Sequence, residues 1–141
     1  MTTSKRLETV RGYWGAGEAG NWDGAAQFIG PGYYFIDRAT GVESRTIEEL
    51  LEGRADEEAW SDSRFEIGEV YDTAGDAMIV EAVKSGTITG PWRSMSTEGQ
   101  RVTFPICTIF RFNDDDLIVG EEAYYDMASI QRQLGYEVSS A

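Results

Sequence analysis

The chain has 141 residues, of which 41% are apolar and 26% are charged. This length and composition fit one globular domain with a hydrophobic core and exclude a disordered or fibrous chain. Twelve basic residues against 25 acidic ones give a formal net charge of −13, which repels nucleic acid and anionic membranes, so we expect neither as a partner.

The first part of the chain has mainly helical patterning. Apolar residues recur every three or four positions over residues 5–19, which predicts an amphipathic helix. A second short helix is predicted over residues 21–29, with Asn21 as its N-cap and a Gly-Pro-Gly run after its last residue. Aromatic and β-branched residues then predict a strand over residues 33–37, and a third helix is predicted over residues 44–60.

The second half of the chain changes to an apolar period of two, which is typical of strands. We predict strands over residues 64–73, 77–89, 101–113 and 117–125, with a hairpin turn after the first and after the third. Residues 127–134 have helical spacing again and predict a final helix. Helices followed by antiparallel strands indicate the α+β class, in which a curved sheet has helices over its concave side and encloses a pocket.

The strand predicted over residues 101–113 has one apolar side. Its alternation places the even-numbered residues from Val102 to Phe112 in the interior, and Thr108 is the only polar side chain among them. Pro105 cannot donate a backbone hydrogen bond, so the strand should be bulged or at a sheet edge there.

Two residue counts limit the chemistry. The chain has no histidine, which excludes histidine-dependent triads and histidine-containing zinc sites, so any reaction must use carboxylates, hydroxyls or the backbone. The single cysteine, Cys107, cannot form an intramolecular disulfide and has no evident basic neighbour to activate it. We expect no metal and no cofactor.

The first residues lack the apolar run of a signal peptide, so we expect a cytoplasmic location.

Three stretches of the sequence together carry a family resemblance. They are VRGYWGAGEAGNWDGAAQFIGPGYYFIDRATG, SGTITGPWRSMSTEGQRVTF and IFRFNDDDLIVGEEAYYDMASIQRQLG. They resemble the SnoaL-like polyketide cyclases, which lie in the nuclear transport factor 2-like superfamily together with ketosteroid isomerase and limonene epoxide hydrolase. The resemblance covers about residues 10–135 and implies one domain over residues 1–141, with an ordered core at about 5–135.

The resemblance also implies a specific architecture and a set of departures from the family pattern. The architecture is a cone-shaped half-barrel, also called cystatin-like, in which a curved, mainly antiparallel sheet wraps around N-terminal helices and a deep apolar cavity. The aspartate that the cyclases use as acid and base falls at Ala123 here, and their partner histidine falls at Ile109. Compared with ketosteroid isomerase, Tyr13 and Asp37 match the tyrosine donor and the aspartate base, and the second oxyanion donor falls at Thr108.

Three of these residues are candidates for proton transfer and oxyanion binding. Asp37 ends an aromatic strand, where burial at a cavity mouth would make its carboxylate a usable base; the alternative is that it caps the next turn or pairs with Arg38. Tyr13 and Thr108 would donate hydrogen bonds to a developing enolate oxygen. The alternatives are an ordinary core tyrosine and an ordinary strand threonine.

Glu121 is the fourth candidate, as a reserve acid. The register implied by the resemblance places Ala123, and therefore Glu121, on the cavity side of the last strand. A bulge would exchange Glu121 with Glu122. The alternative for each glutamate is a solvated strand face in an acidic protein.

Aromatic side chains supply the candidate contacts to a flat hydrophobic substrate, although aromatic residues at core periodicity are more often only core. The candidates are Trp14, Tyr33, Phe35, Trp60, Trp92, Phe104, Phe110 and Tyr124.

Three functions remain open from the sequence. The first is a cofactor-independent cyclase or isomerase that uses enolate chemistry on a hydrophobic polyketide-like or steroid-like carbonyl compound. The second is a non-catalytic module that binds a hydrophobic ligand or mediates dimer formation, which the alanine at position 123 favours. The third is epoxide hydrolase-like or oxygenating chemistry with Asp37 and Glu121 as a rearranged acid pair. We expect a homodimer formed through the open sheet face, with Val70, Cys107 and Ile109 facing outward.

Overall fold

The protein is described by a computed structural model over residues 4–46, 48–49, 60–92, 95 and 99–138. The helices and strands follow in the order α1 (Lys5–Glu18), α2 (Trp22–Ala26), β1 (Ile29–Asp37), β2 (Glu43–Ser44), β3 (Trp60–Asp72), β4 (Ala77–Ile88), β5 (Gln100–Phe112), β6 (Ile118–Tyr125) and α4 (Met127–Gln133). The predicted α+β class is confirmed.

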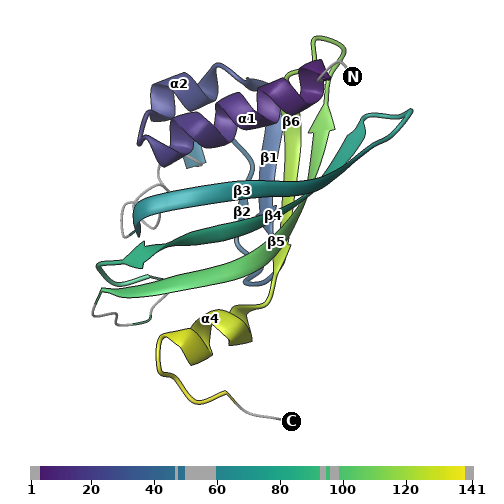
Figure 1. Ribbon diagram of the computed structural model, residues 1–141. Helices are drawn as coiled ribbons and strands as arrows, with labels where there is room; N and C mark the ends of the chain where they lie inside the picture. Colours follow the sequence, from purple (N-terminus) through teal and green to yellow (C-terminus); the bar gives the residue numbers. More distant parts are fainter. Residues whose placement is uncertain (1–3, 47, 50–59, 93–94, 96–98, 139–141) are drawn as a thin grey trace.

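The described strands form one sheet in the order β2-β1-β6-β5-β4-β3. Strands β1 and β6 are parallel, and the other neighbouring pairs are antiparallel. Helices α1 and α2 lie together across one face of the curved, unclosed sheet near one end, and α4 lies at the opposite end (Figure 1). We call the face that carries α1 the inner face and the opposite one the outer face.

The two N-terminal helices begin at side-chain caps. The Ser4 hydroxyl accepts from the Leu7 amide, and the Asn21 side chain accepts from the Gly24 amide, which confirms the predicted cap of α2. Helix α2 ends at Ala26, however, and not at residue 29. Ile29 pairs with Ile118 at the start of β6. Because of this pairing, β1 begins at Ile29 and includes the Gly-Pro-Gly run that was expected to follow the helix.

Two predictions about β3 need correction. Trp60 opens this strand and does not close the third predicted helix, whose residues 47 and 50–59 lie outside the described part. Val70 packs against the core and does not face outward, because the register shifts between Ile67 opposite Ala82 and Val70 opposite Val80. Between these pairs two residues of β3, Gly68 and Glu69, lie opposite the single Glu81 of β4, and this bulge returns Val70 to the inner face.

Strand β5 follows the predicted alternation. The even-numbered residues from Val102 to Phe112 are all buried. The strand lies between β4 and β6, but β6 ends at Tyr125 opposite Ile106. Pro105 therefore stands at a local edge, which is one of the two positions predicted for it.

Gln133 of α4 continues the sheet where β6 stops. The Thr103 amide donates to Gln133 Oε1, and Gln133 Nε2 donates to the Thr103 carbonyl, each over 2.9 Å. We expect Gln133→Ala to lower the free energy of unfolding by about 1 kcal/mol, since each exposed hydrogen bond contributes modestly. Denaturant unfolding checks this, with the exposed Gln27→Ala as the control that should change it little; equal effects of the two variants would contradict it.

The core lies between α1 and the inner face. Trp14 of α1 stacks on Phe65 of β3, with ring centroids 4.2 Å apart and an interplanar angle of 10°. The rings of Trp14 and Phe110 also meet edge to face, with their centroids 5.4 Å apart. These contacts fix the helix over the strands that carry the polar residues described next.

Candidate functional site

A group of polar side chains surrounds Ala123 on the inner face. The register places Asp37 of β1 and Thr108 of β5 directly on either side of Ala123. Glu121 and Tyr125 lie two residues before and after it, so they share its face. We call these five positions the Ala123 ring; at its centre stands a methyl group where the family resemblance implies an aspartate.

Glu121 is buried and accepts hydrogen bonds from two tyrosines. Only 6% of the surface of Glu121 is exposed. The hydroxyls of Tyr13 on α1 and Tyr33 on β1 each donate to Glu121 Oε2 over 2.9 Å, and the two hydroxyl oxygens are 3.3 Å apart. Glu122, next in sequence, lies on the outer face and forms an ion pair with Arg38. The expected inward orientation of Glu121 is therefore present.

Tyr33 remains a hydrogen-bond donor throughout the physiological pH range. Burial raises the pKa of its hydroxyl well above the ordinary value, and the nearby charge of Glu121 raises it further. The Glu121 carboxylate is consequently held beside the O–H group of Tyr33 and not beside a Tyr33 phenolate.

Asp37 is also buried, at 2% exposure. Its Oδ1 accepts from the amides of Ala39 and Thr40 at 3.0 and 3.1 Å, which is the turn-capping geometry given above as an alternative. Its Oδ2 accepts from the Tyr125 hydroxyl at 2.6 Å. Three donors thus orient the carboxylate at the edge of the Ala123 ring, and the role of Asp37 as a base stays a prediction.

The predicted aromatic contacts separate into three groups. Trp14 and Phe110 lie in the core beneath α1. Tyr33 and Phe35 lie on β1, near Glu121. Trp60, Trp92 and Phe104 form a cluster farther along the inner face, with Trp60 5.4 Å from Trp92 and 6.1 Å from Phe104.

Tyr124 does not join these inner-face residues. It is 43% exposed and pairs with Cys107 on the outer face. Its predicted contact with substrate on the inner face is therefore wrong: strand alternation puts consecutive residues on opposite faces, and Tyr125 occupies the inward position.

Sequence reasoning missed two inner-face residues. Tyr125 was not recognised as the hydrogen-bond partner of Asp37. Lys84 is only 7% exposed, and its Nζ lies 4.7 Å from the ring centroid of Trp60 and 5.0 Å from that of Phe65. The alternation along β4 was the available signal, because it places Lys84 on the same side as Val80.

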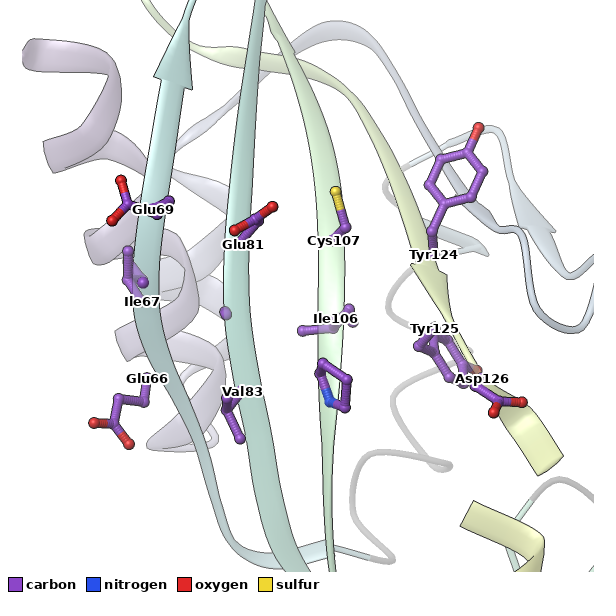
Figure 2. A pocket seen from close by; sticks show the side chains of 13 residues that line it. Glu66, Ile67, Glu69, Glu81, Val83, Ile106, Cys107, Tyr124, Tyr125 and Asp126 are labelled. Carbon is purple, nitrogen blue, oxygen red and sulfur yellow. The ribbon is translucent and has the colours of Figure 1, made fainter. Parts of the chain in front are cut away.

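A shallow trough of about 1120 Å³ lies across β3 to β6 (Figure 2). On the outer face, Val83, Pro105 and Tyr124 supply exposed apolar surface. Carboxylates line it as well, including Glu81 beside Cys107. The described residues include no group of three or more cysteine or carboxylate side chains placed to hold a metal ion.

Cys107 is expected to react slowly with thiol reagents. Burial raises the pKa of its thiol, and the nearby carboxylate of Glu81 raises it further, so less thiolate is present at a given pH. At pH 7.5 we expect modification by a colorimetric disulfide reagent several-fold slower than that of glutathione, and faster modification in Glu81→Gln. Reaction as fast as glutathione in the native protein would contradict this.

A family model places these residues in context. The model described as SnoaL-like polyketide cyclase matches residues 7–134, a range that contains the whole Ala123 ring. The chain belongs to this family. In this SnoaL-like protein residue 123 is an alanine, at the position where the family resemblance implies an aspartate. No curated protein sequence matches the chain significantly.

Solved structures share the fold of this SnoaL-like chain. A hypothetical protein from Catenulispora acidiphila with a ketosteroid isomerase-like fold, in complex with trimethylamine, has a TM-score of 0.78 and 20% identity, with 96% of each chain covered. A proposed SnoaL-like polyketide cyclase from Jannaschia sp. CCS1 has a TM-score of 0.81 and 21% identity, covering 98% of this chain and 99% of that one. AclR, a proposed hydroxylase from Streptomyces galilaeus, has a TM-score of 0.76 and 18% identity, covering 99% and 91%. These likenesses show the nuclear transport factor 2-like fold.

Within the described residues, no helix combines the length and apolar character that spanning a bilayer requires.

Proposed function

We propose that the protein is a cofactor-independent cyclase or isomerase that acts on a hydrophobic polyketide-like or steroid-like carbonyl compound through an enolate. The observation that carries the proposal is the Ala123 ring, in which Asp37, Thr108, Glu121 and Tyr125 surround a small side chain on a largely apolar face. Two buried carboxylates beside hydroxyl donors are the groups that enolate formation and reprotonation need.

Each group has a proposed role that its position supports. Asp37 takes the proton from the carbon next to the substrate carbonyl, and the electrons of that C–H bond form the enolate. The Thr108 hydroxyl donates to the enolate oxygen, and the Tyr13 hydroxyl also donates to it when it turns away from Glu121 Oε2, which keeps its hydrogen bond from Tyr33. At the second stage the proton held by Asp37 returns to the substrate. It goes to carbon where a new C–H bond forms; where a new C–C bond forms, Glu121 relays it to the alkoxide oxygen that this step leaves. The Tyr125 hydroxyl keeps Asp37 in position.

Asp37→Asn tests the base directly. Asparagine keeps an oxygen that can accept from the turn amides of Ala39 and Thr40, so the turn should persist while the base is lost. We expect turnover of a responsive polyketide or steroid ketone to fall by about 10²- to 10⁴-fold, with ligand binding retained. Product analysis and fluorescence binding measure the two effects, and Asp23→Asn on the exposed side of α2 is the control. Unchanged turnover would remove Asp37 from the mechanism.

Two alternatives have specific support. Alanine at position 123 favours a protein that only binds its ligand; binding of aromatic polyketides and steroids without any product would establish this. The similarity to AclR, a proposed hydroxylase, favours chemistry in which Asp37 and Glu121 hold a water or position an oxygenated intermediate. Product mass analysis in ¹⁸O-labelled water or under ¹⁸O₂ distinguishes that chemistry from cyclisation or isomerisation, which add no oxygen.

We also propose that the protein forms a homodimer through the outer face. Val83, Cys107 and Tyr124 would supply the apolar contact, while the carboxylates of the trough would repel one another across a two-fold axis. We therefore expect light scattering to give twice the mass of 15.7 kDa, with dimerisation strengthened by salt. Val83→Lys should yield monomer, and Val42→Lys, at an equally exposed position away from the trough, should not. A monomer at every salt concentration would contradict the proposal.

A further inference from the structure

Two consecutive tyrosines of β1 lie on opposite sides of the short segment of β6 that carries Glu121. The parallel register pairs Tyr34 with Gly120 and Phe35 with Glu121. Tyr33 reaches Glu121 on the inner face, where its hydroxyl donates to Oε2 over 2.9 Å. Alternation directs Tyr34 to the outer face, and its ring occupies the space beside Gly120, since a Cβ at position 120 would lie 2.7 Å from Tyr34 Cζ. The two side chains thus hold this segment of β6 from both faces.

The two donors to Glu121 Oε2 come from different layers of the fold. Tyr33 is 2% exposed and belongs to a strand that pairs directly with β6. Tyr13 reaches the same oxygen from α1, which lies across the sheet and is not hydrogen-bonded into it. The two hydroxyl oxygens are 3.3 Å apart. Tyr33 is therefore fixed relative to Glu121 by strand pairing, and Tyr13 is the donor better suited to turn toward a ligand.

A buried carboxylate depends on donors that stay in place. Burial removes water from Glu121, and the ionised form is then stabilised by the hydrogen bonds that replace it. When Tyr13 donates to a ligand oxygen, Oε2 keeps the hydrogen bond from Tyr33. Burial and the charge of Glu121 both raise the pKa of Tyr33, so this hydroxyl keeps its proton and remains a donor.

We propose that Tyr33 is the positioning residue of Glu121, and that its hydroxyl keeps the carboxylate ionised and in one orientation while Tyr13 turns to the ligand. Tyr33 then acts through Glu121 and not through contact with substrate, the role expected for it from the sequence. This inference rests on the proposed function for the proton relay by Glu121, but the effect of Tyr33 on the carboxylate is measurable without turnover.

The ionisation of Glu121 is the readout that needs no substrate. A donor to an ionised carboxylate lowers its pKa, so loss of the donor raises it. We expect Tyr33→Phe to raise the pKa of Glu121 by about 1, since hydrogen bonds to charged groups are stronger than neutral ones. ¹³C NMR of protein labelled at glutamate Cδ measures this, and the Glu121 signal is assigned by its loss in Glu121→Gln. Tyr34→Phe removes a hydroxyl from the opposite face and should leave the titration unchanged.

Other titratable groups near Glu121 are present in both variants. Those on its face among the described residues are Tyr13 on α1, Tyr33 and Asp37 on β1, and Tyr125 on β6, while β5 places Phe110 opposite it. Only the Tyr33 hydroxyl is removed by Tyr33→Phe. An unchanged titration of Glu121 in the folded variant would overturn the inference.

Kinetics separate a positioning role from a contact with substrate. Tyr33→Phe keeps the ring, so it should lower kcat about tenfold and change KM by less than about twofold. Tyr34→Phe should keep native values of both. A raised KM with an unchanged Glu121 titration would overturn the inference and make Tyr33 a substrate contact. If Glu121→Gln stays active while Tyr33→Phe still raises the pKa of Glu121, the proposed relay fails and the positioning role stands.

The native protein labelled at tyrosine Cζ gives a second measurement, which does not depend on the folding of Tyr33→Phe. After sequential assignment, the Tyr33 signal should move with the same midpoint as the Glu121 carboxyl signal, because their hydrogen bond couples the two groups. The Tyr34 signal should not follow that midpoint. A Tyr33 signal that is insensitive to the ionisation of Glu121 would overturn the inference.

Discussion

Glu121→Gln is expected to lower turnover of a responsive carbonyl substrate by about 10²- to 10⁴-fold, the usual contribution of a positioned acid or base. Glutamine has nearly the same shape, and its amide oxygen can still accept from Tyr13 or Tyr33, so the local packing should survive. It cannot accept and return a proton at the pH of the assay. Single-turnover and steady-state product measurements would show the loss in kcat, with a smaller change in KM.

The adjacent Glu122 provides the matched control. It has the same chemistry and lies on the same strand, but it points to the outer face, where it pairs with Arg38. Glu122→Gln should therefore keep nearly full activity. Equal losses in the two variants would indicate a general effect on β6, and full activity of Glu121→Gln would exclude Glu121 from proton transfer. Tyr13→Phe, which removes one donor to Glu121 Oε2, should give a smaller loss than Glu121→Gln.

Phe110→Ala is expected to lower the free energy of unfolding by about 3 to 5 kcal/mol. Phe110 is 0% exposed. The centroid of its ring lies 5.4 Å from that of Trp14, in an edge-to-face contact, and 6.5 Å from that of Phe112. Truncation removes buried apolar surface and leaves a cavity between α1 and the sheet. Denaturant unfolding followed by tryptophan fluorescence measures the change.

Val83→Ala serves as the comparison for this stability prediction. Val83 belongs to the neighbouring strand β4 but is 43% exposed on the outer face. Its truncation should cost about 0.5 kcal/mol or less, as is usual for exposed positions. A loss below about 1 kcal/mol for Phe110→Ala would mean that the helix and the sheet close around the gap, and that the core is less rigid than its packing indicates.

Local patterns were sufficient for much of the fold. The alternation of β5 correctly separated its inner from its outer residues, and Asn21 correctly marked the start of α2, because both signals depend on near neighbours in the chain. Tertiary pairing changed two other predictions. Ile29 joined β1 because Ile118 was available as a partner, and a bulge in β3 turned Val70 inward. Neither effect has a clear signature within the segment itself.

The candidate site was predicted less completely than the fold. The inward orientation of Glu121 followed from the register implied by the family resemblance. Its hydrogen bond to Tyr33 did not, since the two residues are 88 positions apart in the sequence. Lys84 was missed, although the alternation along β4 places it on the buried side with Val80.

The parallel contact between β1 and β6 governs when the site can form. Tyr33 and Asp37 lie 88 positions before Glu121 and Tyr125, respectively, so they are synthesised earlier than these partners. Until β6 joins the sheet, the early hydroxyl and carboxylate groups must stay hydrated or find temporary partners. Completion of the reaction centre and the long-range pairing of β1 with β6 are therefore one event, which ties the acquisition of chemical competence to the formation of a contact between distant parts of the chain.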